Sequence, residues 1–383
     1  MRQKPPKLLY VVNIPRFFVS HRLPLALAAR DAGFNVYIAT SGLDASSVNQ
    51  ITAHGLQFHP LPLSQHGVNP LRELRTLLAL RKLYNDLQPD LLHHVSIKPV
   101  IYGGIAARLT GGTPAIQAMS GLGYLFSSEE FKAKSLARLI QPIFRFALAP
   151  ADAHMIFQNP DDQRVFVERR LIDRAKTTVI RGSGVDETLF SPSAENTSDK
   201  PVVLFAGRLL WQKGLGDFVE TARRLHGKAR FTVVGYEEST SPLNVPAAQL
   251  QAWHDAGLIE WQGKRDDMPA VYAESNIVCL PSTYGEGVPK VLIEAAACAR
   301  ACVATNTPGC REIVRHGENG LLVPPNNLNA LSDAVKRLID NASLRNTMGT
   351  RGREIVLAGF TCRQVIEETI ILYRAALKQA ETA

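Results

Sequence analysis

Short apolar segments alternate with helical patterns along the chain, and this alternation is the feature that most constrains the fold. Strands are expected at 7–14, 35–40 and 90–96, with helices near 20–33 and 69–88 between them. Such a strand–helix–strand rhythm predicts a parallel sheet with helices on both faces. Because 383 residues are too many for one ordinary core, we expect more than one α/β domain.

A polar segment at 191–201 (SPSAENTSDKP) separates two such rhythms and predicts a linker. The second rhythm begins at 202–208 (VVLFAGR) and ends in helices. We expect two Rossmann-like domains, an N-terminal one (residues 1–190) and a C-terminal one (residues 191–362), with a last helix (residues 363–383) packing back on the first domain. Ligands of such sheets bind beyond the carboxyl ends of the strands, which places the expected site in a cleft between the two facing sheets.

The net charge of +8 is carried by the first half of the chain. Residues 1–190 hold 22 Lys and Arg against 14 Asp and Glu, whereas residues 191–383 hold 21 of each. The two halves are therefore expected to have different partners. Five cysteines form no CxxC pair and are expected to be buried and reduced. The start of the chain lacks the long apolar region of a signal peptide, so we expect a cytoplasmic protein.

Two glutamates bracket seven residues in the stretch STYGEGVPKVLIEA, residues 282–295. Glu286 lies between two glycines, and Pro289 suits the start of a helix whose free N–H groups can bind a phosphate. Glu294 interrupts an apolar helix, where a charge without a partner is costly. A phosphate flanked by hydroxyl-rich groups describes a nucleotide-sugar. The alternative interpretation is a turn residue and an exposed helix residue.

Two cations lie in the stretch FAGRLLWQKG, residues 205–214, where a strand ends and a helix starts. Arg208 and Lys213 are poorly placed for the helix dipole unless an anion binds there, and both side chains suit a phosphate. A solvated pair of surface charges is the alternative. The sequence contains no Asp-x-Asp motif. We therefore expect no metal requirement, with the two cations and a helix dipole neutralising the leaving group.

These stretches, together with the run WQGKRDDMPAVYAESNIVCL…GLLVPP at residues 261–325, resemble the retaining glycosyltransferases of family 4. That family has the GT-B fold of two Rossmann-like domains and a Glu-x7-Glu motif. The N-terminal stretches FFVSHRLPLALAARDAGFNVYIAT, SIKPVIYGGIAARLTG and SGLGYLF look like one branch of it. Members of that branch add sugars to lipid-linked intermediates of capsule, O-antigen and protein-glycosylation oligosaccharides; one adds N-acetylgalactosamine to undecaprenyl-diphospho-bacillosamine.

The resemblance implies a role for each matching position. Arg208 and Lys213 match the pair that holds the donor diphosphate in the family. Glu294 matches the glutamate that binds the ribose diol, and Glu286 matches the glutamate near the donor sugar. The catalytic set expected from this is Glu286, Arg208 and Lys213. Backbone groups that would contact the sugar, the phosphate or the base are those of Gly287, Val288, Gly263 and Lys264.

The N-terminal domain departs from the family in one loop. Many members carry a histidine that contacts the donor sugar, whereas the loop here reads Met119-Ser120-Gly121-Leu122-Gly123. The candidates for the acceptor side are His21, Ser120 and Gly121. His21 is expected to open the first helix and face the cleft, although Ser20 could instead cap that helix with His21 packed beneath.

Two further features of the first half bear on partners. His93 and His94 end a strand, so one of them must point inward, and a core histidine is favoured over a base. Residues 131–149 form a basic amphipathic pattern, in which Lys134, Arg138 and Arg145 would contact an anionic membrane surface. The alternative is an ordinary surface helix packed on its domain.

The sequence thus predicts a peripheral membrane enzyme on the cytoplasmic face. It would move a hexose or N-acetylhexosamine from a UDP-sugar to a polyprenyl-diphosphate-linked saccharide with retention of configuration, and it would need no cofactor and bind no nucleic acid. Three alternatives remain open: a nucleotide-sugar epimerase of the same fold, a glycosyltransferase with a soluble acceptor, and a sugar-binding module without catalysis.

Overall fold

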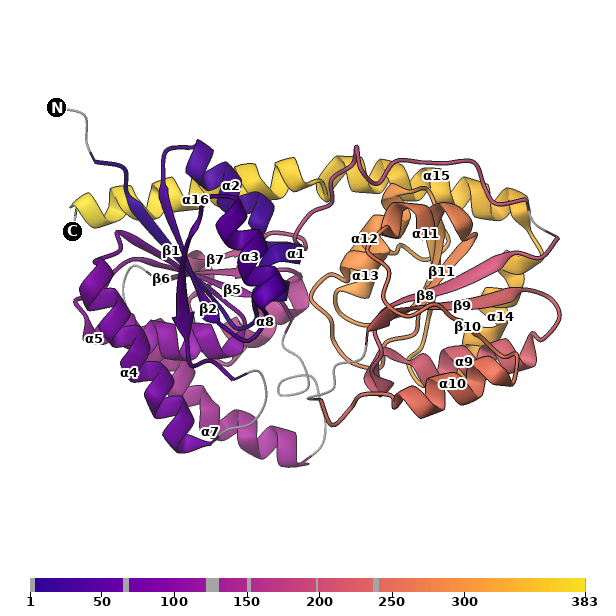
Figure 1. Ribbon diagram of the computed structural model, residues 1–383, viewed down its shortest axis with the longest axis horizontal. Coiled ribbons are helices and arrows are strands. Elements are labelled where there is room, and N and C mark those ends of the chain that lie inside the picture. Colours follow the sequence, from indigo (N-terminus) through magenta and orange to yellow (C-terminus); the bar gives the residue numbers. More distant parts are fainter. Residues whose placement is uncertain are drawn as a thin grey trace. The chain divides into compact units, whose positions relative to one another are not determined.

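The computed structural model describes residues 4–64, 69–121, 131–149, 153–197, 199–236 and 241–382, with the backbone alone for 131–139 and 381–382. The chain divides into two units. One comprises Met1–Ser183 and Cys362–Ala383, and the other Gly184–Thr361. Each unit is built on one parallel sheet with helices on both faces (Figure 1).

The first unit contains a seven-stranded sheet in the order β3-β2-β1-β4-β5-β6-β7. Its strands are short and nearly continuous runs of apolar residues, as expected where both faces of a parallel sheet are covered. Their bounds are β1 Lys7–Val12, β2 Asn35–Ser41, β3 Gln57–Leu61, β4 Leu91–Val95, β5 Ala115–Met119, β6 Ala153–Phe157 and β7 Thr177–Val179.

Helices cover both faces of this sheet. Side-chain caps fix three helix starts, because the side chains of Asp44, Asn69 and Asn159 accept bonds from first-turn N–H groups. The helices are α1 Pro15–His21, α2 Leu23–Asp31, α3 Ala45–Ala53, α4 Pro70–Leu87, α5 Gly104–Leu109, α7 Phe131–Leu148, α8 Pro160–Glu168 and α16 Cys362–Thr382, with a π-helical turn η1 at Pro99–Gly103.

The C-terminal helix α16 belongs to the first unit. Together with α1 and α2 it packs on one face of the sheet, where Tyr373 lies among buried residues such as Tyr10 and Phe18. Helices α4 and α5 pack on the opposite face. Within the described residues, no helix is long and apolar enough to cross a bilayer.

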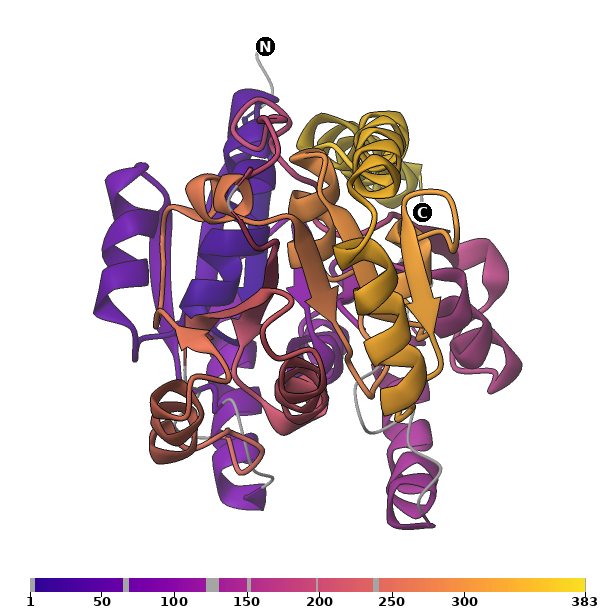
Figure 2. The ribbon, with the colours of Figure 1, turned by 90° about the vertical axis from the view of Figure 1, so that its right-hand side faces the viewer.

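The second unit contains a six-stranded parallel sheet in the order β10-β9-β8-β11-β12-β13 (Figure 2). Its strands are β8 Val202–Arg208, β9 Arg230–Tyr236, β10 Glu260–Trp261, β11 Ile277–Leu280, β12 Ala301–Thr305 and β13 Gly320–Val323. Its helices are α9 Leu215–Arg224, α10 Ala247–Asp255, α11 Met268–Glu274, α12 Lys290–Ala297, α13 Cys310–Ile313, α14 Leu328–Ile339 and α15 Ala342–Gly359, with a short 3-10 turn η3 at Trp211–Lys213.

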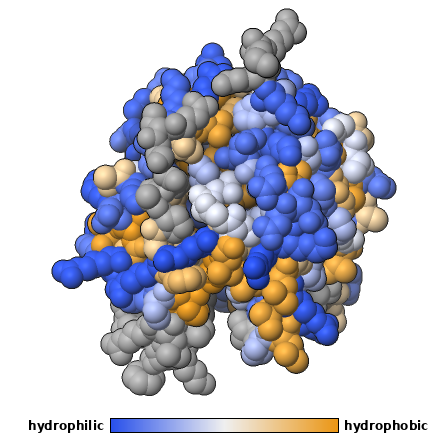
Figure 3. Space-filling view, turned by 90° about the vertical axis from the view of Figure 1, so that its left-hand side faces the viewer, coloured by the Kyte–Doolittle hydropathy of each residue, from blue (hydrophilic) through white to orange (hydrophobic). Residues whose placement is uncertain are grey.

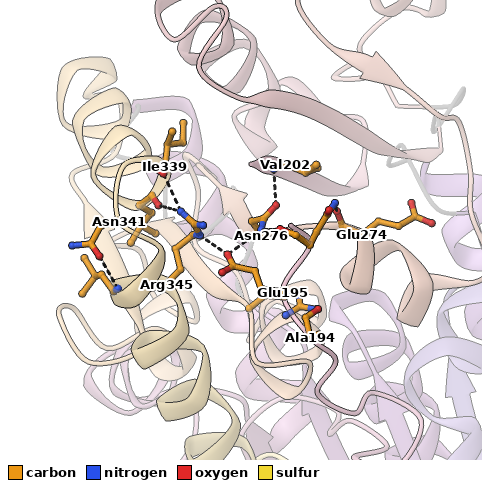
Figure 4. Close-up of polar contacts among 12 residues, drawn as sticks. Ala194, Glu195, Val202, Glu274, Asn276, Ile339, Asn341 and Arg345 are labelled. Carbon is orange, nitrogen blue, oxygen red and sulfur yellow. Dashed lines mark hydrogen bonds and ion pairs between the residues drawn. The ribbon is translucent and has the colours of Figure 1, made fainter. Parts of the chain in front are cut away.

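The polar segment expected to be a linker is held against the second unit by hydrogen bonds. The boundary between the two units lies between Ser183 and Gly184, earlier in the chain than the expected boundary after residue 190. Figure 4 shows Glu195 between Arg345 and Asn276. The Arg345 Nε lies 2.5 Å from its carboxylate and the Asn276 amide 2.9 Å. Arg300 donates to the Ser193 carbonyl of the segment, and Arg353 donates to the Phe190 carbonyl just before it. These anchors come from distant parts of the sequence, so local composition does not reveal them.

Candidate functional site

Three loops of the second unit meet beyond the carboxyl ends of β8, β11 and β12. The Thr283 N–H donates to the Gln212 carbonyl at 2.9 Å, and the Glu286 N–H donates to the Pro308 carbonyl at 3.2 Å. Because the strands are parallel, their carboxyl ends share one edge of the sheet. The predicted Lys213 and Glu286 lie in these loops, Arg208 is the last residue of β8, and Glu294 lies in helix α12 that follows.

Two glycines allow the loops to approach so closely. Gly214 has a φ of 78°, and a Cβ there would lie 2.0 Å from the Pro281 carbonyl oxygen. Gly309 has a φ of 83°, and its Cβ would lie 1.6 Å from the Gly287 carbonyl oxygen. Any side chain at either position would push the loops apart. Gly309 was not singled out from the sequence, although the turn signal Pro308-Gly309 marks it.

Lys213 and Glu286 form a buried ion pair. The Lys213 Nζ lies 2.5 Å from Glu286 Oε1, and their side chains are 12% and 10% exposed. The Ser282 hydroxyl lies 3.0 Å from the same carboxylate oxygen. Burial favours a lower pKa for Lys213, but Glu286 and Tyr284 together act more strongly in the opposite direction, so that the pKa is raised and the ammonium stays charged.

Arg208 and Tyr284 surround this pair. Arg208 ends β8 opposite Tyr236 of β9 and is half-buried. Its charge acts on both Lys213 and Tyr284. The Lys213 Nζ also lies 5.5 Å from the centre of the Tyr284 ring. The edge of the sheet therefore gathers two cations beside one carboxylate, an arrangement suited to a doubly charged phosphate group.

Helix α12 begins beside these cations. Pro289 is its N-cap residue, one position before the helix rather than inside it, and supplies no side-chain cap. Gly287 and Val288 precede it and are buried. A helix N-terminus with backbone N–H groups and a favourable dipole is a suitable place for an anion.

Glu294 lies inside α12 and is 8% exposed. The Tyr272 hydroxyl donates to its Oε2 at 2.9 Å, and the Lys290 Nζ lies 3.5 Å from Oε1. Burial raises the pKa of Glu294, while Lys290 and Tyr272 act in the opposite direction. The sequence interpretation missed Tyr272, because nothing in the local pattern of α11 links it to a glutamate 22 residues later.

The backbone near Gly263 lies at the same edge of the sheet. Gly263 follows β10 with a φ of 68°, and its carbonyl accepts from the Gly235 N–H at 2.9 Å. The side chain of Lys264 is exposed and pairs with Asp266 at 2.7 Å. These contacts fix the main chain expected to meet the base and leave the Lys264 side chain on the surface.

The acceptor-side candidates belong to the first unit. His21 ends α1 instead of opening a helix, stacks on Phe17 and lies 2.6 Å from the Ser20 hydroxyl. Ser20 is not a cap, because the helix already starts at Pro15 and the Ser20 hydroxyl donates to the carbonyl of Arg16.

The loop after β5 is described only in part. Ser120 and Gly121 follow this strand, and Gly121 has a φ of 109°. Leu122 and Gly123 lie outside the described residues.

Both strand-end histidines of the first unit are buried. The His93 Nδ1 lies 2.5 Å from the Tyr373 hydroxyl, and His94 bonds Tyr84 and Gln117. Burial lowers the pKa of His94 to about 4, so its ring is neutral at physiological pH. These are the surroundings of core histidines.

Comparison with known proteins identifies the class. The family description "Glycosyl transferases group 1" matches residues 186–355, and "Glycosyl transferase 4-like" matches residues 7–159. The protein is therefore a glycosyltransferase. Its two parallel sheets are those of the GT-B fold, with the 4-like match in the first unit and the group 1 match in the second.

Two curated relatives match over most of their length. One is the N,N'-diacetylbacillosaminyl-diphospho-undecaprenol alpha-1,3-N-acetylgalactosaminyltransferase of Campylobacter jejuni, 26% identical over 85% of this chain and 87% of the relative. The other is the UDP-Gal:alpha-D-GlcNAc-diphosphoundecaprenol alpha-1,3-galactosyltransferase of Escherichia coli, 26% identical over 82% of each chain. Among solved structures, Anabaena HepE in complex with UDP is similar in fold, with a TM-score of 0.76 and 19% identity over 96% of this chain and 100% of that one.

Proposed function

We propose that this glycosyltransferase moves a hexose or N-acetylhexosamine from a UDP-sugar to a saccharide linked to polyprenyl diphosphate. The assignment of a UDP-sugar donor rests on one observation. Arg208, Lys213 and the start of α12 lie at the same edge of the sheet, with Glu286 and Glu294 beside them. The acceptor part is supported by the names of the two curated relatives, which describe transferases acting on diphospho-undecaprenol-linked sugars.

In this proposal the donor diphosphate lies against Arg208, Lys213 and the N–H groups of α12. Lys213 then exchanges its bond to Glu286 for one to a phosphate oxygen, and Glu286 becomes available to the sugar hydroxyls. As the glycosidic bond breaks, the two cations stabilise the charge that develops on the leaving diphosphate. Glu294 accepts hydrogen bonds from the ribose diol.

We further propose that transfer retains configuration and needs no metal. The names of both relatives specify alpha linkages, and the common UDP-hexoses are alpha anomers. Front-face attack, with the leaving phosphate accepting the proton of the attacking hydroxyl, would give this outcome. The charge of the leaving group is met by Arg208 and Lys213, which is the role that a divalent cation has in other transferases.

An apolar surface of the first unit supports contact with a membrane. Helices α4, α5 and α7 line a groove of about 550 Å³. Hydrophobic side chains gather on this side of the unit (Figure 3). The large exposed ones on α4 and α7 are Leu71, Leu74, Leu78, Ile143 and Phe146. Such a patch beside basic residues fits an anionic bilayer, where the lipid-linked acceptor resides.

Of the basic residues proposed to contact the membrane, the structure describes only the side chain of Arg145. Arg145 donates to the backbone carbonyls of Arg169 and Arg170, so part of its hydrogen-bonding capacity serves the fold. The side chains of Lys134 and Arg138 lie outside the described residues. The proposal therefore rests on the apolar patch and on the charge of the first half, and it places the enzyme on the cytoplasmic face of the membrane.

The test is incubation with labelled UDP-sugars, with and without a polyprenyl-diphosphate-linked acceptor. The proposal requires UDP release that depends on the acceptor. An isomerised sugar formed without acceptor would instead indicate an epimerase, and binding without turnover would indicate a sugar-binding protein. Transfer to water-soluble saccharides alone would refute the lipid-linked acceptor.

A further inference from the structure

Lys290 occupies an unfavourable position unless it serves a neighbour. It is the first residue of α12, an end at which the helix dipole opposes a cation. Its ammonium lies 3.5 Å from Glu294 Oε1, one turn further along the helix. Its side chain is 29% exposed, so the ammonium is partly withdrawn from water towards a buried carboxylate.

Tyr272 reaches the same carboxylate from a different element. It is fully buried in α11, and its hydroxyl lies 2.9 Å from Glu294 Oε2. Each carboxylate oxygen thus has one protein partner, and each keeps a lone pair for a ligand hydroxyl. A glutamate held from both sides cannot rotate freely, so its remaining lone pairs have fixed directions.

The other groups around Glu294 do not compete with Lys290 for this role. Cys298 lies one turn further along α12, and burial raises the pKa of its thiol to about 11, which leaves it neutral. Arg353 of α15 donates to the carbonyls of Phe190 and Ala297. Among the described residues, Lys290 is the cation that acts on Glu294, and Tyr272 is the neutral donor.

We propose that Lys290 and Tyr272 are positioning residues that hold Glu294 as an oriented carboxylate for the donor's ribose diol. The inference rests on the proposed donor site. The ionised form of Glu294 binds the ribose hydroxyls, so donor affinity falls as the pH drops and this carboxylate becomes protonated. Lys290 favours the ionised form and therefore determines the pH at which the affinity begins to fall.

The test is the affinity for UDP-galactose, UDP-glucose and UDP-N-acetylgalactosamine between pH 5.5 and 8.5, measured by calorimetry. The phosphates of these esters stay ionised over this range, so the pH dependence reports on the protein. In Lys290→Met and in Tyr272→Phe the acid-side loss of affinity should begin at higher pH, with about three- to tenfold weaker binding than wild type at the acid end. Near the alkaline end the variants should approach the wild type, and Lys290→Arg should retain the wild-type profile.

A matched control is available on α14. Lys336 pairs with Asp340 at the same spacing of four residues, but that pair is exposed. Lys336→Met should leave the affinity profile unchanged. Loss of affinity by the same factor at every pH in Lys290→Met would show that Lys290 does not keep Glu294 ionised and would overturn the proposal, as would an unchanged profile. If the wild type binds none of the three UDP-sugars, the donor assignment itself is wrong.

Discussion

The buried ion pair between Lys213 and Glu286 gives a prediction in which stability and donor use can be separated. Lys213→Met keeps the aliphatic stem and removes the charge, leaving Glu286 buried without its cation. Breaking a buried pair costs about 3–5 kcal/mol. Because the Ser282 hydroxyl still bonds Glu286, we take the lower end, about 3 kcal/mol. For a unit of this size that lowers the melting temperature by about 6–12 °C.

The same substitution should impair transfer for a different reason. Loss of a charge-assisted contact to the donor diphosphate removes about 2–4 kcal/mol of transition-state stabilisation, or roughly 30- to 1,000-fold in kcat/KM. Glu286→Gln should destabilise similarly, because it leaves the buried Lys213 ammonium unpaired. The double variant Lys213→Met/Glu286→Gln removes both charges and should regain most of the stability, but not the activity.

The assay compares melting temperature and acceptor-dependent UDP release for the wild type, both single variants and the double variant. Lys82→Met is the control, because its pair with Asp86 is exposed and should contribute less than about 1 kcal/mol. Wild-type turnover by folded Lys213→Met would refute the donor contact. A double variant as unstable as either single one would refute the assignment of the stability loss to an uncompensated charge.

Three other outcomes are expected. Activity should persist in EDTA, and loss of activity that Mg²⁺ or Mn²⁺ restores would refute the metal-free mechanism. Glu294→Gln should weaken UDP-sugar binding yet raise the free energy of unfolding by about 1 kcal/mol near pH 7–8. Burial raises the pKa of Glu294 in the folded protein, so its ionised form lowers stability. The gain in stability should therefore vanish at acid pH, where the carboxyl is protonated. Reversing Lys134, Arg138 and Arg145 to glutamate should abolish co-sedimentation with anionic liposomes at low salt and leave UDP affinity unchanged. Liposome binding equal to that of the wild type would contradict the proposed contact. A second variant that keeps Arg145 tests whether loss of its bonds to the fold contributes to the effect.

The parallel architecture was predictable because most strands are short apolar runs between recognisable helices. The expected strand at 202–208 is β8 residue for residue. Two edge or near-edge strands escaped notice. Gln57–Leu61 contains His59 and Pro60, and Gly320–Val323 is only four residues long. Their pairing in the sheet is set by tertiary contacts, which local periodicity does not express.

The candidate site was predictable in its residue types and only partly in its contacts. Gly-rich loops and charges at helix starts directed attention to Lys213 and Glu286, but the sequence did not show that they bond each other. Tyr272 and Gly309 could not be assigned, because Tyr272 bonds Glu294 of α12 and Gly309 packs against the Gly287 carbonyl, and both partners are distant in sequence. The position of His21 was wrong because Pro15 starts the helix early.

The measurement that tests the central claim most directly is calorimetric titration of the wild type with UDP, UMP and uridine. If Arg208, Lys213 and the start of α12 form a diphosphate site, UDP should bind at least about tenfold more tightly than UMP, because the second phosphate adds charge-assisted contacts. UMP should in turn bind more tightly than uridine, and Arg208→Ala should remove most of the difference between UDP and UMP. Equal affinities for UDP and UMP in the wild type, or a difference that survives Arg208→Ala, would contradict the assignment of this edge of the sheet to the donor diphosphate.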